Sequence, residues 1–137
     1  MPRTNHTLRF TDPNDAEGRA KTGCGIWRID DPIATDNDIF RGIPKNATLT
    51  YASYIADDAG ASTATVTFNI EIRGNATPFT AGTDVWAADK VCNTTSANTS
   101  KFDNDGTITA RQILWVTISA VANTPTTFCL YLEWEIN

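Results

Sequence analysis

The sequence predicts an all-β fold: a jelly-roll-like antiparallel β-sandwich preceded by an extended N-terminal arm. Apolar and polar residues alternate over several segments, which is the pattern of a strand with one buried and one exposed face. Turn-forming Gly, Pro, Asn and Asp separate these segments at short intervals, as in sandwiches and barrels. Threonine supplies 22 of the 137 residues, and its β-branched side chain favours strands over helices.

The first 23 residues are expected to form the arm, and residues 24–137 the sandwich domain. The arm is polar, so it cannot bury a core of its own. The arm has four basic and three acidic residues, a charge of +1. Because the whole chain has a net charge of −5, the domain has a charge of −6. We expect the arm to be mobile in the free protein and to contact an acidic neighbouring surface. Its candidate interaction residues are Arg3, Leu8, Arg9, Phe10, Arg19 and Lys21.

A first strand is expected at residues 24–30. Asp31 and Pro32 end it, because proline lacks the amide hydrogen that a strand ladder needs. Turns are expected at residues 36–38 and 42–46, where Asp, Asn and Gly tolerate the backbone angles that turns require.

The next two strands, residues 47–56 and 63–73, are expected to form a hairpin around the Asp- and Gly-containing segment between them. In the first of them Leu49, Tyr51 and Ile55 share one parity. The second alternates most strictly, so we predict that it is a central strand of its sheet. Its apolar face consists of Val66, Phe68, Ile70 and Ile72.

One short helix is expected after Thr83 and Asp84, which can cap its first turn. Ala87 and Ala88 support it, because alanine has the highest helix propensity. The polar residues 93–100 that follow are expected to be turn-like.

Two long strands, residues 107–119 and 127–136, are expected to close the sandwich on either side of a turn at residues 123–125. Their alternation indicates that the C-terminal segment lies inside a sheet. The expected buried residues are Ile108, Leu114, Val116 and Ile118 in the first strand, and Phe128, Leu130, Leu132, Trp134 and Ile136 in the second.

Trp115 and Tyr131 fall on the outward parities of these two strands, which are expected to be neighbours. An outward aromatic side chain can pack within the chain, bind a sugar ring, or be buried against another subunit. We predict that Trp115 or Tyr131 lies near the interface of a homotrimer.

Composition excludes several classes of protein. The net charge of −5 and the sequence pI of about 4.6 oppose binding to nucleic acid, whose phosphates repel an acidic surface. No apolar run approaches the roughly 18 residues of a membrane-spanning helix, and no apolar signal core is visible at the start. Cys24, Cys92 and Cys129 are odd in number and widely spaced, which predicts buried free thiols.

Catalytic and metal-binding groups are few. The one histidine, His6, lies in the arm, where it cannot be held beside a nucleophile, and zinc-ligand spacing is absent. Glu133 and Glu135 share a strand face, but alternation alone would place them so. Calcium is the alternative to plain turn chemistry at residues 36–38 and 103–105. We expect no enzyme activity and no cofactor.

Three segments resemble small structural proteins of tailed bacteriophages: T-F-N-I-E-I-R (67–73), A-G-T-D-V-W-A-A-D-K-V (81–91) and I-L-W-V-T-I-S-A-V-A-N-T-P-T-T-F-C-L-Y-L-E-W-E-I (113–136). The pattern is similar to that of phage head decoration (cement) proteins and related virion β-sandwiches, and it covers residues 45–137. The resemblance implies a jelly-roll domain, often trimeric, that sits on the capsid lattice while its N-terminal arm reaches over neighbouring capsid subunits. It carries over no functional residue.

Taken together, these features predict a virion structural protein that is assembled in the host cytoplasm and located on the capsid surface. It would bind the major capsid protein as a homotrimer and stabilise the head lattice, without contacting nucleic acid or a membrane. The alternative is a carbohydrate-binding, lectin-like module or the receptor-binding module of a phage tail.

Overall fold

The structure is a computed structural model that describes residues 4–10, 22–40, 45–58, 60, 63–104 and 106–137. Within these ranges every regular element is a strand, so no helix long enough to cross a membrane is found there. The strands are β1 (Thr4–Phe10), β2 (Thr22–Asp30), β3 (Asn37–Phe40), β4 (Ala47–Asp57), β5 (Thr65–Arg73), β6 (Thr83–Asp84), β7 (Lys90–Cys92), β8 (Ala97–Thr99), β9 (Thr107–Ile108), β10 (Ile113–Ala122) and β11 (Thr127–Ile136).

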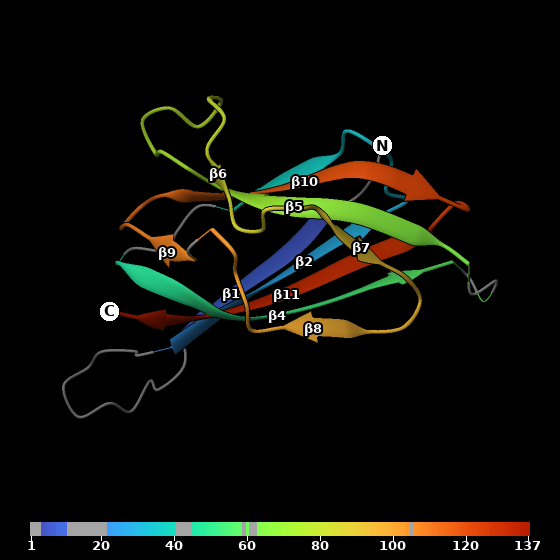
Figure 1. Cartoon of the computed structure of the whole chain (residues 1–137), viewed down its shortest axis with the longest axis horizontal. Helices are drawn as coiled ribbons and strands as arrows, with labels where there is room; N and C mark the ends of the chain where they lie inside the picture. Colours follow the sequence, from blue (N-terminus) through green and yellow to red (C-terminus); the bar gives the residue numbers. More distant parts are fainter. Residues whose placement is uncertain (1–3, 11–21, 41–44, 59, 61–62, 105) are drawn as a thin grey trace.

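The strands form two antiparallel sheets packed as a sandwich (Figure 1). Sheet A has the order β1-β2-β11-β4-β8, with β9 also paired to β4. Sheet B has the order β3-β10-β5-β6, with β7 also paired to β5. From β2 to β5 the chain alternates between the two sheets, and it crosses again from β10 to β11. This is the connectivity of a jelly roll, which confirms the predicted fold class.

The core lies between the sheets and is dominated by aromatic side chains. Phe68 of the predicted central strand is at its centre, with ring centroids of Phe128, Tyr54 and Trp86 at 4.8, 5.1 and 5.8 Å. The alternation predicted for residues 63–73 and 127–136 is confirmed, except that Ile136, expected to be buried, is only half-buried at the end of its strand. The inward side chains are Val66, Phe68, Ile70 and Ile72 on β5, and Phe128, Leu130, Leu132 and Trp134 on β11.

Two glycines in β2 make room for the largest of these core side chains. Gly23 and Gly25 face inward, and a Cβ at Gly23 would overlap the indole ring of Trp134. A Cβ at Gly25 would lie 2.8 Å from the Trp27 ring. Both rings are fully buried, so glycine is required here by packing.

The predicted pairing of consecutive strands is wrong in two places. Residues 47–56 and 63–73 do not form a hairpin, because β4 belongs to sheet A and β5 to sheet B. In the same way β10 and β11 are not neighbours in one sheet. The turn between them contains Asn123 and Thr124 with φ of 57° and 49°, and it carries the chain from one sheet to the other. Each strand of these two pairs still buries one face, but it packs across the core against the sheet that contains the other strand.

The parity predicted for β4 is also wrong after its fourth residue. Leu49 is buried as expected, but Tyr51 is only half-buried and Ile55 is 36% exposed. The register with β11 shifts beside Thr50, which inserts one extra residue as a β-bulge. The bulge reverses the faces of the rest of the strand, so Ala52, Tyr54 and Ala56 are buried instead.

Residues 83–91 form no helix. Thr83 and Asp84 pair with β5 as strand β6, and Val85 and Trp86 are both fully buried. The indole nitrogen of Trp86 donates to the Lys101 carbonyl at 2.9 Å. Burial of these two side chains outweighs the local preference for a capped helical turn.

Three smaller expectations also need correction. The turn-like residues 93–100 contain strand β8, and the turn expected at 36–38 leads directly into β3. The strand expected at 107–119 is split into β9 in sheet A and β10 in sheet B. Between the two parts Arg111 has φ of 71°, and Gln112 donates to the Thr109 carbonyl at 3.0 Å in a turn.

Part of the segment predicted as an arm is a strand in the structure. β1 pairs along its length with β2 at the edge of sheet A, from Thr4 opposite Ile29 to Phe10 opposite Gly23. β2 itself begins at Thr22, two residues before the predicted start of the domain. Residues 1–3 and 11–21 lie outside the described ranges.

Candidate functional site

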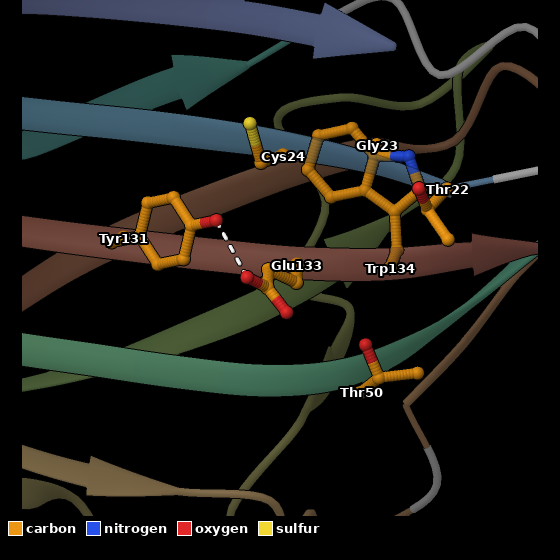
Figure 2. Close-up of a pocket in the computed structure, with 7 residues that line it drawn as sticks. All are labelled: Thr22, Gly23, Cys24, Thr50, Tyr131, Glu133 and Trp134. Carbon is orange, nitrogen blue, oxygen red and sulfur yellow. Dashed lines mark hydrogen bonds between the residues drawn. The ribbon is translucent and has the colours of Figure 1, made fainter. Parts of the chain in front are cut away.

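The outer face of sheet A carries two hollows that share Tyr131. The first, called the polar hollow, encloses about 160 Å³ where β2, β11 and β4 run side by side (Figure 2). The bulged Thr50 lies on its β4 side, and Cys24 on its β2 side. Its lining residues are Thr22, Gly23, Cys24, Thr50, Tyr131, Glu133 and Trp134.

A hydrogen bond along β11 fixes the side chain of Tyr131 in this hollow. Figure 2 shows its hydroxyl directed at Glu133, and it donates to Glu133 Oε1 at 2.6 Å. The Glu133 carboxylate, and burial to a smaller extent, raises the pKa of Tyr131 above its ordinary value. Tyr131 therefore stays neutral at physiological pH and presents a ring with a fixed orientation. The ring of Tyr51 on β4 packs edge-on against it at 6.2 Å.

The second hollow, called the apolar socket, lies beside Tyr131 in the direction away from Glu133 and encloses about 180 Å³. In the strand register Tyr131 lies between Ile26 of β2 and Ser53 of β4, and Cys129 lies opposite Ile55. The side chains of Ile26 and Ile55 are 41% and 36% exposed. The residues that line the socket are Ile26, Ser53, Tyr54, Ile55, Cys129, Leu130 and Tyr131.

Trp115 lies on the opposite side of the sandwich, on the outer face of sheet B. It is only 8% exposed, because residues of the same chain cover its ring. The Arg73 guanidinium carbon lies 4.0 Å from the Trp115 ring centroid, and Phe79 packs edge-on against the ring at 6.1 Å. Trp115 thus points outward but is covered by Arg73 and Phe79 of its own chain. Of the alternatives that the sequence left open, this is packing within the chain.

Phe79 belongs to a loop, residues 74–82, that projects beyond the body of the sandwich between β5 and β6 (Figure 1). The Phe79 side chain is 83% exposed. Sequence reasoning did not single it out, although a large apolar residue in a Gly-, Pro- and Thr-rich loop is a recognisable signal.

The base of this projecting loop is held by a small charge network. Glu71 Oε2 accepts hydrogen bonds from Arg73 Nε at 2.8 Å and from the Gly82 amide at 2.9 Å, so it joins the two ends of the loop. Arg73 also donates to the Pro78 carbonyl at 3.1 Å. Burial would raise the pKa of Glu71, but the hydrogen bonds from Arg73 and Gly82 outweigh it and lower the pKa.

A wider groove lies at one end of the sandwich, between the β2–β3 and β10–β11 connections. It encloses about 540 Å³, and Ile33, 55% exposed, is on its rim. Asp31, Asn123 and Thr124 along it have positive φ. Its other lining residues are Pro32, Val121, Ala122, Pro125 and Thr126.

The structure does not bring the predicted interaction residues together. Trp115 and Tyr131 lie on opposite outer faces, since their strands belong to different sheets. Three of the arm residues, Leu8, Arg9 and Phe10, are in β1 at the edge of sheet A. The predicted contacts of Arg3, Arg19 and Lys21 fall outside the described residues.

The acidic turns that raised the possibility of calcium use their carboxylates within the chain. Asp36 Oδ2 accepts from the Ile33 amide at 2.8 Å, and Asp103 Oδ2 accepts from the Ala87 amide at 3.3 Å. In the part of the chain that the structure describes, no three acidic, His or Cys side chains are grouped as they would be around a metal ion.

All three cysteines are free thiols, as predicted, but only Cys92 is buried. Burial raises the pKa of Cys92 to about 12 and also raises the pKa of the half-buried Cys129. Both stay protonated at neutral pH, which makes them weak nucleophiles.

Comparison with known proteins gives no family. No protein-family model and no curated protein matches the chain. Structures with some similarity include the latex cysteine peptidase Peruvianin-I from Thevetia peruviana, with 8% identity and a TM-score of 0.34 over 96% of this chain and 61% of that one. Bacillus subtilis oxalate decarboxylase has 6% identity and a TM-score of 0.24 over 92% of this chain and 25% of that one.

The structures of infectious bursal disease virus, Gt and Gx strains, are 10% and 12% identical, with TM-scores of 0.18 and 0.19. They match over 98% and 99% of this chain and 40% of theirs. The chain therefore spans less than two thirds of each of these proteins, and similarities this weak identify no relative.

Proposed function

We propose that this chain is a virion structural protein of a tailed bacteriophage. It decorates the head, binds the major capsid protein as a homotrimer, and stabilises the lattice from the capsid surface. The observation that carries the proposal is that a jelly-roll domain exposes apolar side chains on two opposite sides, at Phe79 and around the apolar socket. Such a domain can bind two neighbours at once, and a subunit that bridges others raises the cost of separating them.

Jelly rolls occur in lectins and enzymes as well as in capsids, so the fold alone does not assign the function. The carbohydrate-binding alternative depended on outward aromatic residues, Trp115 and Tyr131, that could stack on a sugar ring. All four tryptophans, Trp27, Trp86, Trp115 and Trp134, are buried within the chain. Burial therefore removes Trp115 as a surface for a sugar ring, and the carbohydrate alternative rests on Tyr131, which is half-buried on the outer face of sheet A.

The proposal is tested by co-sedimentation of the purified protein with capsids assembled without it. We expect saturable binding at a fixed number of copies per capsid, and capsids that resist heat or low salt better once decorated. Binding that does not saturate, or decorated capsids that disrupt at the same temperature as bare ones, would contradict the proposal. A glycan array is the parallel test of the carbohydrate alternative, and no binding is expected.

The basic residues of the arm are expected to contribute to this attachment. Replacing Arg3, Arg19 and Lys21 by serine leaves the sequence of β1 intact and should weaken capsid binding about tenfold, at about 0.5 kcal/mol for each exposed charge contact. The loss should shrink as salt is added. Lys45→Ser combined with Lys101→Ser, two exposed lysines outside the arm, is the matched control. Equal binding by all three proteins would show that the arm charges do not attach the protein.

A further inference from the structure

We infer that copies of this chain associate by inserting Phe79 of one copy into the apolar socket of the next. The inference deepens the proposed self-association, on which it rests, and identifies the contact. Phe79 is 83% exposed, so covering its large apolar side chain with a partner would remove that surface from water and stabilise the contact. The socket is the apolar hollow in which Ile26 and Ile55 are left exposed.

The two features match in size. The socket encloses about 180 Å³. An apolar protein cavity of about 150 Å³ is large enough to hold benzene, so a phenyl ring fits the socket. Its walls are the side chains of Ile26, Ile55 and Cys129 together with the ring of Tyr131. The hydrogen bond from Tyr131 to Glu133 fixes the orientation of that ring.

The loop that carries Phe79 is organised before it binds. Glu71 joins its two ends, Arg73 holds the Pro78 carbonyl next to Phe79, and Trp115 supports the ring from behind. Ordering a flexible loop costs free energy when it binds, so a loop already held in place forms a stronger contact. Buried aromatic anchors of this kind dominate many protein interfaces.

Charge also permits this occupant. Residues 74–82, G-N-A-T-P-F-T-A-G, contain no charged side chain, so the loop brings no like charge to the acidic face of sheet A. Beside the socket, Arg28 Nε is paired with Asp30 Oδ1 at 2.9 Å. Turning two sheet A faces toward each other would instead bring the Glu133 and Glu135 carboxylates of both copies into one interface, which disfavours a symmetric face-to-face dimer.

The placement of the two features sets the kind of assembly. Phe79 lies on the outer side of sheet B, because its ring packs against Trp115. The socket lies on the outer face of sheet A. Two copies therefore cannot exchange Phe79 side chains reciprocally, and each contact leaves one Phe79 and one socket unfilled. Such a heterologous contact closes into a ring, as in a trimer, or continues as a filament.

Mixing two variants of the full-length chain tests this directly. Phe79→Asp removes the anchor and keeps the socket, whereas Ile55→Lys blocks the socket and keeps the anchor. By analytical ultracentrifugation, the wild type should form closed oligomers and each variant should associate at least about 30-fold more weakly. An equimolar mixture of the two variants should form a dimer, because one intact anchor meets one intact socket.

Val91→Asp is the control, since Val91 is 62% exposed on β7 and belongs to neither feature. Circular dichroism melts check that each variant is folded. A monomeric wild type at all concentrations, a Phe79→Asp protein that assembles like the wild type, or a mixture that stays monomeric would each overturn the inference. Capsid co-sedimentation is a separate measurement, so a failure of the contact and a failure of the proposed function are distinguishable.

Discussion

Close packing of single residues around Trp134 determines how sheet A can face the core. The indole occupies the space that a side chain at Gly23 would need. Gly23→Ala should therefore lower the free energy of unfolding by about 1–3 kcal/mol, as overpacked cores do. Urea denaturation measures the difference.

Gly74→Ala is the matched control, because its Cβ would meet only the Thr77 hydroxyl, at 3.0 Å. We expect a change of less than about 1 kcal/mol there. Equal losses from the two substitutions would show that Trp134 does not depend on the space above Gly23.

The sequence predicts which face of a strand a residue lies on, but it does not predict which groups cover that residue. Alternation correctly placed Trp134 inside and Trp115 outside. Two groups cover Trp115: Arg73, on the neighbouring strand β5, and Phe79, on a projecting loop. The path of that loop cannot be read from a periodic pattern. The same gap explains why Phe79, the most exposed large apolar residue described, was missed.

At the scale of elements, the projecting loop depends on Glu71. Glu71→Gln should lower the free energy of unfolding by about 1–2 kcal/mol at pH 7, because it weakens charge-assisted hydrogen bonds to Arg73 and Gly82. The folded-state pKa of Glu71 is lowered, so its contribution is complete above the unfolded pKa, about 4.3, and is lost as the pH falls through the folded value.

Thermal melts from pH 7 to pH 3 should therefore show the wild type and Glu71→Gln converging at the acid end. The exposed Glu135 on β11 provides the control, and Glu135→Gln should change stability by less than about 0.5 kcal/mol. A Glu71 effect that persists unchanged at pH 3 would mean that the carboxylate charge is not what holds the loop.

The long strands of the sandwich were predictable from the sequence, whereas the short strands β3, β6 and β8 and the interruptions within strands were not. The alternation of β5 and β11 continues along almost their whole length, so their faces follow directly. Thr50 inserts a bulge into β4 and the positive φ of Arg111 separates β9 from β10. Both depend on partner strands, and a period-2 pattern contains no information about the partner.

At the scale of the whole molecule, the sandwich was predictable but the order of its strands was not. Each strand buries one face whether its successor pairs beside it or crosses to the opposite sheet. The chain crosses between sheets at most of its long connections, so pairing by adjacency along the sequence failed for β4 with β5 and for β10 with β11. That crossing also separates Trp115 and Tyr131 onto opposite outer faces, so the two aromatic residues do not form one surface.

We propose that this chain is a structural component of a virion. The direct test is quantitative mass spectrometry of purified virus particles from a culture in which the gene for this chain is expressed. We expect the chain to be present in a fixed, high ratio to the major capsid protein and to stay with emptied heads after the tails are removed. Absence of the chain from the particles, or a few copies that separate with the tail, would show that it does not decorate the head.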